Sequence, residues 1–130
     1  MNLRTLATLL LLTTALPSQA ATSTTYGTGC RNLLLEMTPP VIGTDALFTV
    51  QNGSTLGVVG VGTTKMNLPI GGGCIIYTNV FWTIPYGTMG DPFGFPIPNN
   101  PGLIGLKFYA QAADTLKQSW SNGVEGMIGR

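Results

Sequence analysis

After residue 20 the chain consists of short apolar runs separated by glycine, proline and asparagine. The runs are five to eleven residues long, and turn formers such as Pro39-Pro40 and Asn52-Gly53 stand between them. Runs of this length bounded by turn residues are typical of antiparallel strands. All 18 glycines follow residue 20, which disfavours helices. The pattern therefore predicts an all-β fold, an antiparallel β-sandwich of the immunoglobulin or jelly-roll type.

We expect about seven strands, at 33–37, 46–51, 56–61, 74–84, 93–98, 104–111 and 120–128. The run 46–51 alternates apolar and polar residues, as a strand with one buried face does. Asn52-Gly53 then predicts a hairpin to 56–61, where the glycines indicate a close backbone approach. The prolines of 93–98 predict an edge strand, because proline has no N–H to donate to a neighbouring strand.

Residues 1–20 have the pattern of a secretory signal peptide. Arg4 provides the basic start, Leu6 to Leu16 the apolar segment, and Pro17 to Ala20 the small-residue exit. A membrane-spanning helix needs about 20 apolar residues, so we expect no integral membrane anchor. The prediction is a secreted protein, extracellular or periplasmic, with a signal peptide at 1–20, a flexible leader at 21–32 ending at Cys30, and a single β-sandwich domain at 33–130.

Cys30 and Cys74 are the two cysteines of the chain. An exported protein meets an oxidising compartment, so we predict that they form one intramolecular disulfide. Two cysteines without a histidine do not make a zinc site. Their separation also differs from a redox Cys-x-x-Cys motif.

Charge and composition exclude several functions. Nucleic-acid binding needs a basic patch, and the chain has six Lys and Arg against five Asp and Glu, a net charge of +1. Histidine is absent, so a Ser-His-Asp triad is excluded. We therefore predict no enzyme activity, no catalytic residues, no cofactor, no metal and no nucleic-acid partner.

Two alternatives that use acidic residues stay open. A weak hydrolase needs two carboxylates across a cleft, and Glu36 and Asp91 are the pair we would test. Asp91, Asn99 and Asn100 would be the oxygen ligands of a calcium site, although their spacing matches no calcium loop. Turn and surface positions explain all of these residues without a function.

Several sequence blocks occur in a familiar order. They are Gly71-Gly72-Gly73-Cys74, the segment Phe95 to Asn99, the segment from Leu103 to Ala112, Ser121 to Val124, and the ending Ile128-Gly129-Arg130. In these blocks the chain resembles a family of small secreted bacterial β-sandwich proteins and C-terminal modules of no established function. The resemblance implies export and a sandwich fold, and it implies no catalytic residue.

Aromatic residues are the candidate contacts for a ligand. Trp82, Tyr86 and Trp120 are the ones singled out, because tryptophan and tyrosine stack on sugar rings. Trp82 also lies in phase with a predicted core face of the strand 74–84, formed by Cys74, Ile76, Val80, Trp82 and Ile84, and core is the simpler interpretation. We expect Tyr109 to bond the backbone at a sheet corner.

Two functions remain after these exclusions. Charged residues make up 8% of the chain, against about 25% in typical domains, so its strand edges have little protection against pairing. The main hypothesis is a secreted structural or interaction module that self-associates or binds a protein partner through the 56–61 or the 93–98 strand. The alternative is an extracellular carbohydrate-binding module with a glycan partner on the aromatic residues.

Overall fold

The structure is a computed structural model that describes residues 19–86 and 91–130. The predicted signal peptide therefore lies outside the described residues, apart from Gln19 and Ala20. In the described part, ten strands and one short 3-10 helix form. Their bounds are β1 Thr22–Tyr26, β2 Leu34–Met37, β3 Asp45–Gln51, β4 Gly57–Gly62, β5 Lys65–Gly71, β6 Cys74–Thr78, β7 Trp82–Tyr86, β8 Phe93–Pro96, η1 Pro101–Leu103, β9 Lys107–Asp114 and β10 Ser119–Met127.

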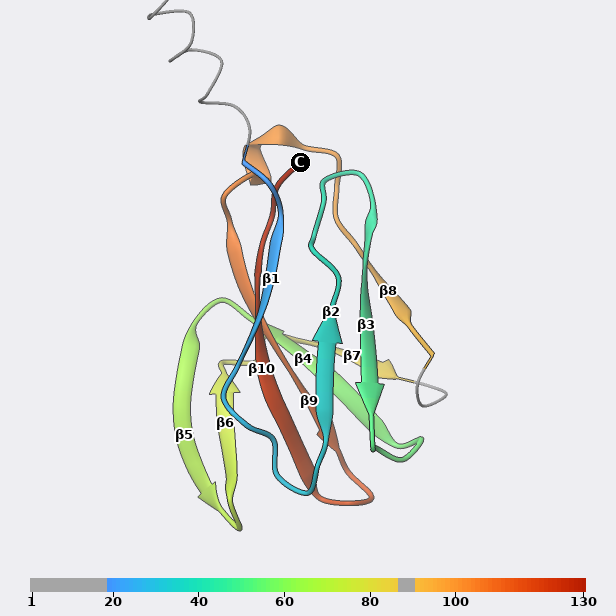
Figure 1. Cartoon of the computed structure of the whole chain (residues 1–130), viewed down its shortest axis with the longest axis vertical. Helices are drawn as coiled ribbons and strands as arrows, with labels where there is room; N and C mark the ends of the chain where they lie inside the picture. Colours follow the sequence, from blue (N-terminus) through green and yellow to red (C-terminus); the bar gives the residue numbers. More distant parts are fainter. Residues whose placement is uncertain (1–18, 87–90) are drawn as a thin grey trace, which may run out of the picture.

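The strands form an antiparallel sandwich, as the sequence predicts. One sheet has five strands in the order β1-β10-β9-β4-β7, and the second has three in the order β2-β3-β8. In Figure 1, β2, β3 and β8 lie to the right of β1 and β10. Buried side chains from both sheets fill the space between them, including Leu35, Phe48, Val59, Ala112 and Val124. Alternate residues of each strand supply this core because side chains alternate between the two faces.

A third layer, the hairpin of β5 and β6, lies on the outer face of the five-stranded sheet, to the left in Figure 1. Gln111 of β9 joins the layers, because its side chain accepts from the Tyr77 N–H at 2.9 Å and donates to the Ile75 carbonyl at 2.7 Å. The disulfide between Cys30 and Cys74 ties the hairpin to the segment before β2, which confirms the predicted pairing.

The segment 21–32, predicted as a leader, contains a strand. Within 21–32, Thr22–Tyr26 is β1 and pairs along its whole length with β10. The segment is rich in threonine, which favours strands. It contains no large aliphatic residue, so apolar periodicity did not reveal it. Finding β1 and β5, and two strands in 74–84, raises the count from the expected seven to ten.

The predicted strand 74–84 is two strands in different sheets, and its expected core face is not continuous. β6 belongs to the outer hairpin, whereas β7 is an edge of the five-stranded sheet. Val80 lies in the connection and is 46% exposed, and Trp82 is 56% exposed. Trp82 and Ile84 pair with the core residues Val61 and Val59, so the predicted inward phase is correct within β7. Trp82 is exposed because it lies at the open margin between the sheets.

The predicted hairpin at Asn52-Gly53 is also wrong. Asn52 has the left-handed backbone expected of this turn, with φ 68°. However, β3 pairs with β2 and β8, and β4 lies between β9 and β7, so the turn connects two sheets. The predicted close approach at 56–61 is confirmed, since a Cβ on Gly57 would collide with the Tyr86 side chain.

The proline-rich edge at 93–98 is confirmed as β8, which pairs with β3 alone. Its apolar residues Phe93, Phe95 and Ile97 contact the core. In the described residues, no helix has the length and apolar character needed to cross a membrane.

Candidate functional site

The edges of the sheets are the first candidate site, because unpaired backbone groups are templates for another strand. The five-stranded sheet ends at β1 and β7, and the three-stranded sheet ends at β2 and β8. The expected contact strand 56–61 is wrong in this respect. As β4 it is an interior strand bonded on both sides.

A side chain blocks the β2 edge. The Asn122 amide accepts from the Leu35 N–H at 2.9 Å and donates to the Leu35 carbonyl at 3.0 Å. These two bonds reproduce those that a neighbouring strand would make, so the middle of β2 has no backbone groups left for a partner. Asn122 is itself buried, which holds the amide in place.

Prolines interrupt the β7 and β8 edges. Pro85 lies within β7, and Pro92 and Pro96 flank or end β8. Proline has no N–H and is a common device against edge pairing.

The β1 edge carries none of these protections. Its sequence, Thr22-Ser23-Thr24-Thr25-Tyr26, has no proline and no charge. Apart from its ladder to β10, no backbone group of β1 bonds another described residue. Thr22, Thr24 and Thr25 are exposed. Within the described residues, β1 is therefore the edge most open to another strand.

Tyr26 anchors the end of β1 on the outer face of the sheet. Its ring lies over Gly123, where a Cβ would collide with it, and its hydroxyl donates to the Tyr77 carbonyl at 2.7 Å. Lys65 Nζ lies 4.4 Å from the ring centre. Burial, followed by the neighbouring Tyr109 and Glu125, raises the pKa of Tyr26 well above its usual value. The hydroxyl thus stays neutral and holds β1 against the hairpin.

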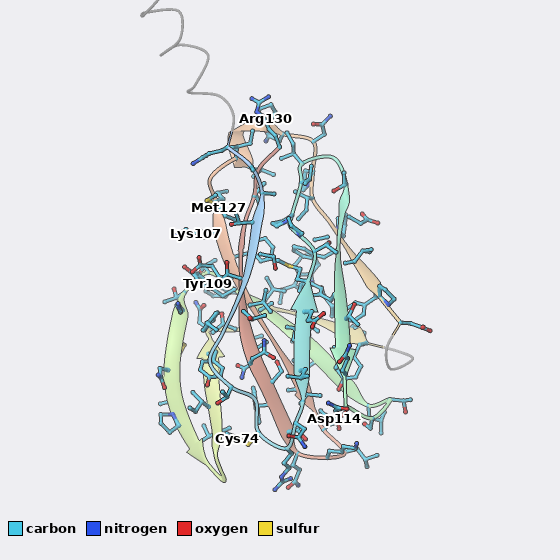
Figure 2. The ribbon with its side chains drawn as sticks, viewed as in Figure 1. Cys74, Lys107, Tyr109, Asp114, Met127 and Arg130 are labelled. Atoms are coloured by element: carbon cyan, nitrogen blue, oxygen red, sulfur yellow. A yellow bond between two sulfur atoms is a disulfide. The ribbon has the colours of Figure 1, made fainter. Side chains whose placement is uncertain are left out.

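Among the described residues, Tyr109 has no partner for the bond expected at a sheet corner. It lies in β9 and packs edge-on against Tyr26, with ring centres 6.3 Å apart. Tyr77 has the backbone-bonding role instead, because its hydroxyl accepts from the Thr28 N–H at 3.0 Å. Figure 2 shows Tyr109 beside Lys107 on the five-stranded sheet, and Lys107 Nζ is 3.9 Å from Glu125 Oε2.

Trp82 and Tyr86 do not form a shared platform. The Trp82 ring packs against Phe95 with centres 5.4 Å apart, and more than half of it remains in solvent. Tyr86 is 4% exposed, and its hydroxyl donates to Asp114 Oδ2 at 2.9 Å. Burial and this bond raise the pKa of Tyr86. Of the two, Trp82 alone is accessible to a ligand.

Asp114 is the centre of a buried polar cluster at one end of the sandwich, away from Arg130 (Figure 2). Its carboxylate accepts from the N–H and the hydroxyl of Ser54, from the Tyr86 hydroxyl, and from the Lys117 N–H at 2.8 Å. Burial alone raises the pKa of Asp114, but the four donors outweigh it and lower the pKa to about 2. A carboxylate with both oxygens occupied is a structural group rather than a general base.

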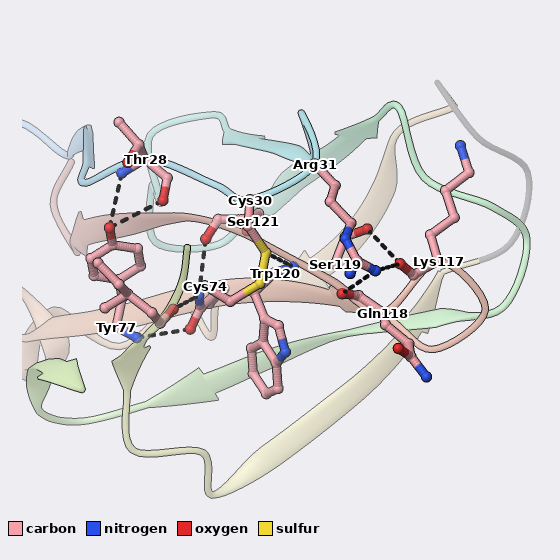
Figure 3. The surroundings of a disulfide bond; sticks show 12 residues. Thr28, Cys30, Arg31, Cys74, Tyr77, Lys117, Gln118, Ser119, Trp120 and Ser121 are labelled. Carbon is pink, nitrogen blue, oxygen red and sulfur yellow. Dashed lines mark hydrogen bonds between the residues drawn. A yellow bond between two sulfur atoms is a disulfide. The ribbon is translucent and has the colours of Figure 1, made fainter. Parts of the chain in front are cut away.

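Trp120 lies beside the disulfide, far along the chain from Trp82, and is half-buried (Figure 3). The backbone N–H of Trp120 donates to Cys30 Sγ at 3.2 Å, and the Trp120 carbonyl accepts from the Cys30 N–H at 2.8 Å. The three aromatic candidates are therefore in three different settings, and they do not form one binding site.

The acidic alternatives are placed on separate elements. Glu36 is exposed on β2, and Asp91 is exposed before β8. Asn100 accepts from the Gly102 N–H at 2.9 Å, so it caps η1. Among the described residues, no group of three His, Cys, Asp or Glu side chains is positioned to hold a metal.

Sequence reasoning missed the β1 edge, the Asn122 cap and the Asp114 cluster. An available signal for Asp114 was its place at the end of the run Ala110-Gln111-Ala112-Ala113, directly in phase with buried alanines. Asn122 has no comparable signal, because its partner is 87 residues away.

Comparisons with protein-family models, with curated proteins and with solved structures found no match to this chain.

Proposed function

We propose that this protein is an exported, non-catalytic structural module that assembles by pairing the β1 edge of one copy with the β1 edge of another. The observation that carries the proposal is the contrast between the four sheet edges. β2 is capped by Asn122, and β7 and β8 carry prolines, whereas β1 is unprotected. Antiparallel β1–β1 pairing is self-complementary and creates a closed two-fold dimer.

A second copy is the partner that the charges favour. β1 itself is uncharged, and the whole chain has a net charge of +1, so two copies meet with little repulsion. Export is supported by the signal-like residues 1–20 and by the disulfide, which persists in oxidising compartments. The resemblance to secreted bacterial sandwich modules supports the same location.

A lysine in β1 tests this assembly. Thr24 is exposed and lies opposite Glu125 of β10, so Thr24→Lys gains an attractive neighbour within its own sheet. A lysine on an edge opposes strand addition. We expect the unmodified protein to form dimers in sedimentation experiments and Thr24→Lys to weaken dimerisation at least about tenfold, or about 1.4 kcal/mol.

Thr83→Lys on the β7 edge is the matched control, since Thr83 is also exposed and the charge change is the same. It should leave the dimer unchanged. A protein that is monomeric up to high concentration, or equal weakening by the two lysines, would contradict β1 pairing.

The second candidate function is glycan binding at Trp82. This residue is 56% exposed, and its ring packs against Phe95, which holds it in place. A Trp120→Phe variant leaves Trp82 as the single tryptophan, so its fluorescence reports on that site. We expect a neutral glycan that binds to shift this emission, and Trp82→Ala to abolish the binding. An emission unchanged across a glycan panel would contradict this candidate.

A further inference from the structure

Two of the few cations of the chain meet in one pocket. Arg31 and Lys117 line an open cavity of about 360 Å³ together with Asn32, Leu34 and Asn52. Among the described residues, neither cation has a carboxylate within 4.0 Å. The ion pair found there joins Lys107 to Glu125 instead. In the part of the chain that the structure describes, the charged ends of Arg31 and Lys117 therefore have no ion-pair partner.

The pocket is held in shape by three segments that are distant in sequence. Arg31 Nη1 donates to the carbonyls of Lys117 at 2.6 Å and Gln118 at 3.3 Å. Lys117 Nζ donates to the Asn52 carbonyl at 3.4 Å, and Asn52 donates to the Asn32 carbonyl at 2.9 Å. Figure 3 shows Arg31 next to the disulfide cysteine, reaching the β9–β10 turn beside Lys117. The disulfide at Cys30 fixes the start of this arrangement.

The donors of Arg31 are only partly used. Both of its bonds come from Nη1, so Nε and Nη2 make no bond to a described residue. These two nitrogens form the edge that binds a carboxylate through two parallel hydrogen bonds. The Lys117 ammonium adds a second positive charge for the same anion.

The backbone around the pocket is unusual. The four described non-glycine residues with positive φ are Arg31, Asn32, Asn52 and Gln118, and each lines the pocket or bonds Arg31. Such conformations cost about 1 kcal/mol or more and cluster at binding sites. Here they bring the cations and the two asparagine amides to one place.

We propose that this pocket binds the carboxylate-bearing sugar unit of an acidic saccharide. Arg31 and Lys117 hold the carboxylate, and the Asn32 side chain, which bonds no described residue, is available to the hydroxyls. Leu34, 42% exposed, offers an apolar wall to the ring. The Leu35 backbone next to Leu34 is already bonded by the Asn122 amide, so an extended acidic peptide has no strand edge to pair with there, which favours a sugar. The site is independent of β1 pairing and of Trp82.

Calorimetric titration with a galacturonate trimer, a neutral galactose trimer and a glutamate trimer tests the proposal on the oxidised protein. We expect the galacturonate trimer alone to bind. Arg31→Lys keeps the positive charge but loses the Nε–Nη2 edge that makes two parallel hydrogen bonds. Lys117→Gln loses the ammonium. Each variant should therefore weaken binding about tenfold. Arg130→Gln, at the opposite end of the molecule, removes the same charge and should have no effect.

Lys117→Gln keeps the test valid if Arg31→Lys fails to fold, because the Lys117 ammonium makes one long contact to its own protein. Absence of galacturonate binding would overturn the proposal. Binding that is insensitive to Lys117→Gln would also overturn it. Equal binding of the glutamate trimer would overturn it as well, and would show that the site binds acidic peptides.

Discussion

Asp114→Asn is expected to lower the free energy of unfolding by about 3 kcal/mol. The carboxylate accepts four hydrogen bonds while being 2% exposed. An amide in its place presents an N–H₂ group to donors such as the Ser54 N–H or the Tyr86 hydroxyl, so buried donors lose their acceptor. Denaturant unfolding measures the loss.

Two variants delimit this effect. Tyr86→Phe removes one of the four donors and should cost about 1 kcal/mol. Asp45→Asn changes an exposed carboxylate and should remain within about 0.5 kcal/mol of the unmodified protein. A loss at Asp114 no larger than that at Asp45 would show that the cluster contributes nothing to stability.

The same cluster predicts an acid dependence. The pKa of Asp114 is about 2 in the folded protein, against 3.8 as its ordinary value. In this interval the unfolded chain binds more protons, so stability falls as pH decreases. The contribution is about 2 kcal/mol, is fully present above about pH 5 and is lost between about pH 4 and pH 2. Asp114→Asn should lack this part of the acid destabilisation.

Removal of the disulfide is expected to cost about 4 kcal/mol. The bond closes a loop between residues 44 apart, and the chain-entropy model gives this value for such a loop. It also anchors the outer hairpin and the segment before β2, so local loosening should add to the entropic loss. Urea unfolding of the Cys30→Ala, Cys74→Ala double variant measures the effect.

Treating the unmodified protein with a thiol reductant is the control, because it breaks the same bond without changing the side-chain volume. Both treatments should give similar losses. If the double variant lost less than about 1 kcal/mol, the Gln111 bonds to β6 would be sufficient to hold the hairpin.

Local features of the fold were predictable because they depend on nearby residues. The period-two pattern of β3, with Ala46, Phe48 and Val50 buried, follows from the alternation of side chains along any strand. The prolines of β8 indicate an edge in any sheet. The disulfide followed from there being two cysteines in a chain with an export signal pattern.

Strand pairing was not predictable in this way. Asn52 adopts the expected turn conformation, but the strand that follows it joins the other sheet. A turn sequence fixes the local backbone, whereas the choice of partner depends on packing between residues far apart. The division of 74–84 between two layers has the same origin, because an apolar run has equal strand propensity in either sheet.

The sequence by itself determined that this chain forms antiparallel strands, that the segment 93–98 is an edge strand, and that the two cysteines are bonded. These properties come from backbone sterics, side-chain alternation and the chemistry of single residues. Only the tertiary structure decided that Trp82 is exposed, that Asp114 is buried, and that Arg31 meets Lys117. Those outcomes depend on which strands become neighbours, a non-local result that the packing of the whole sandwich selects.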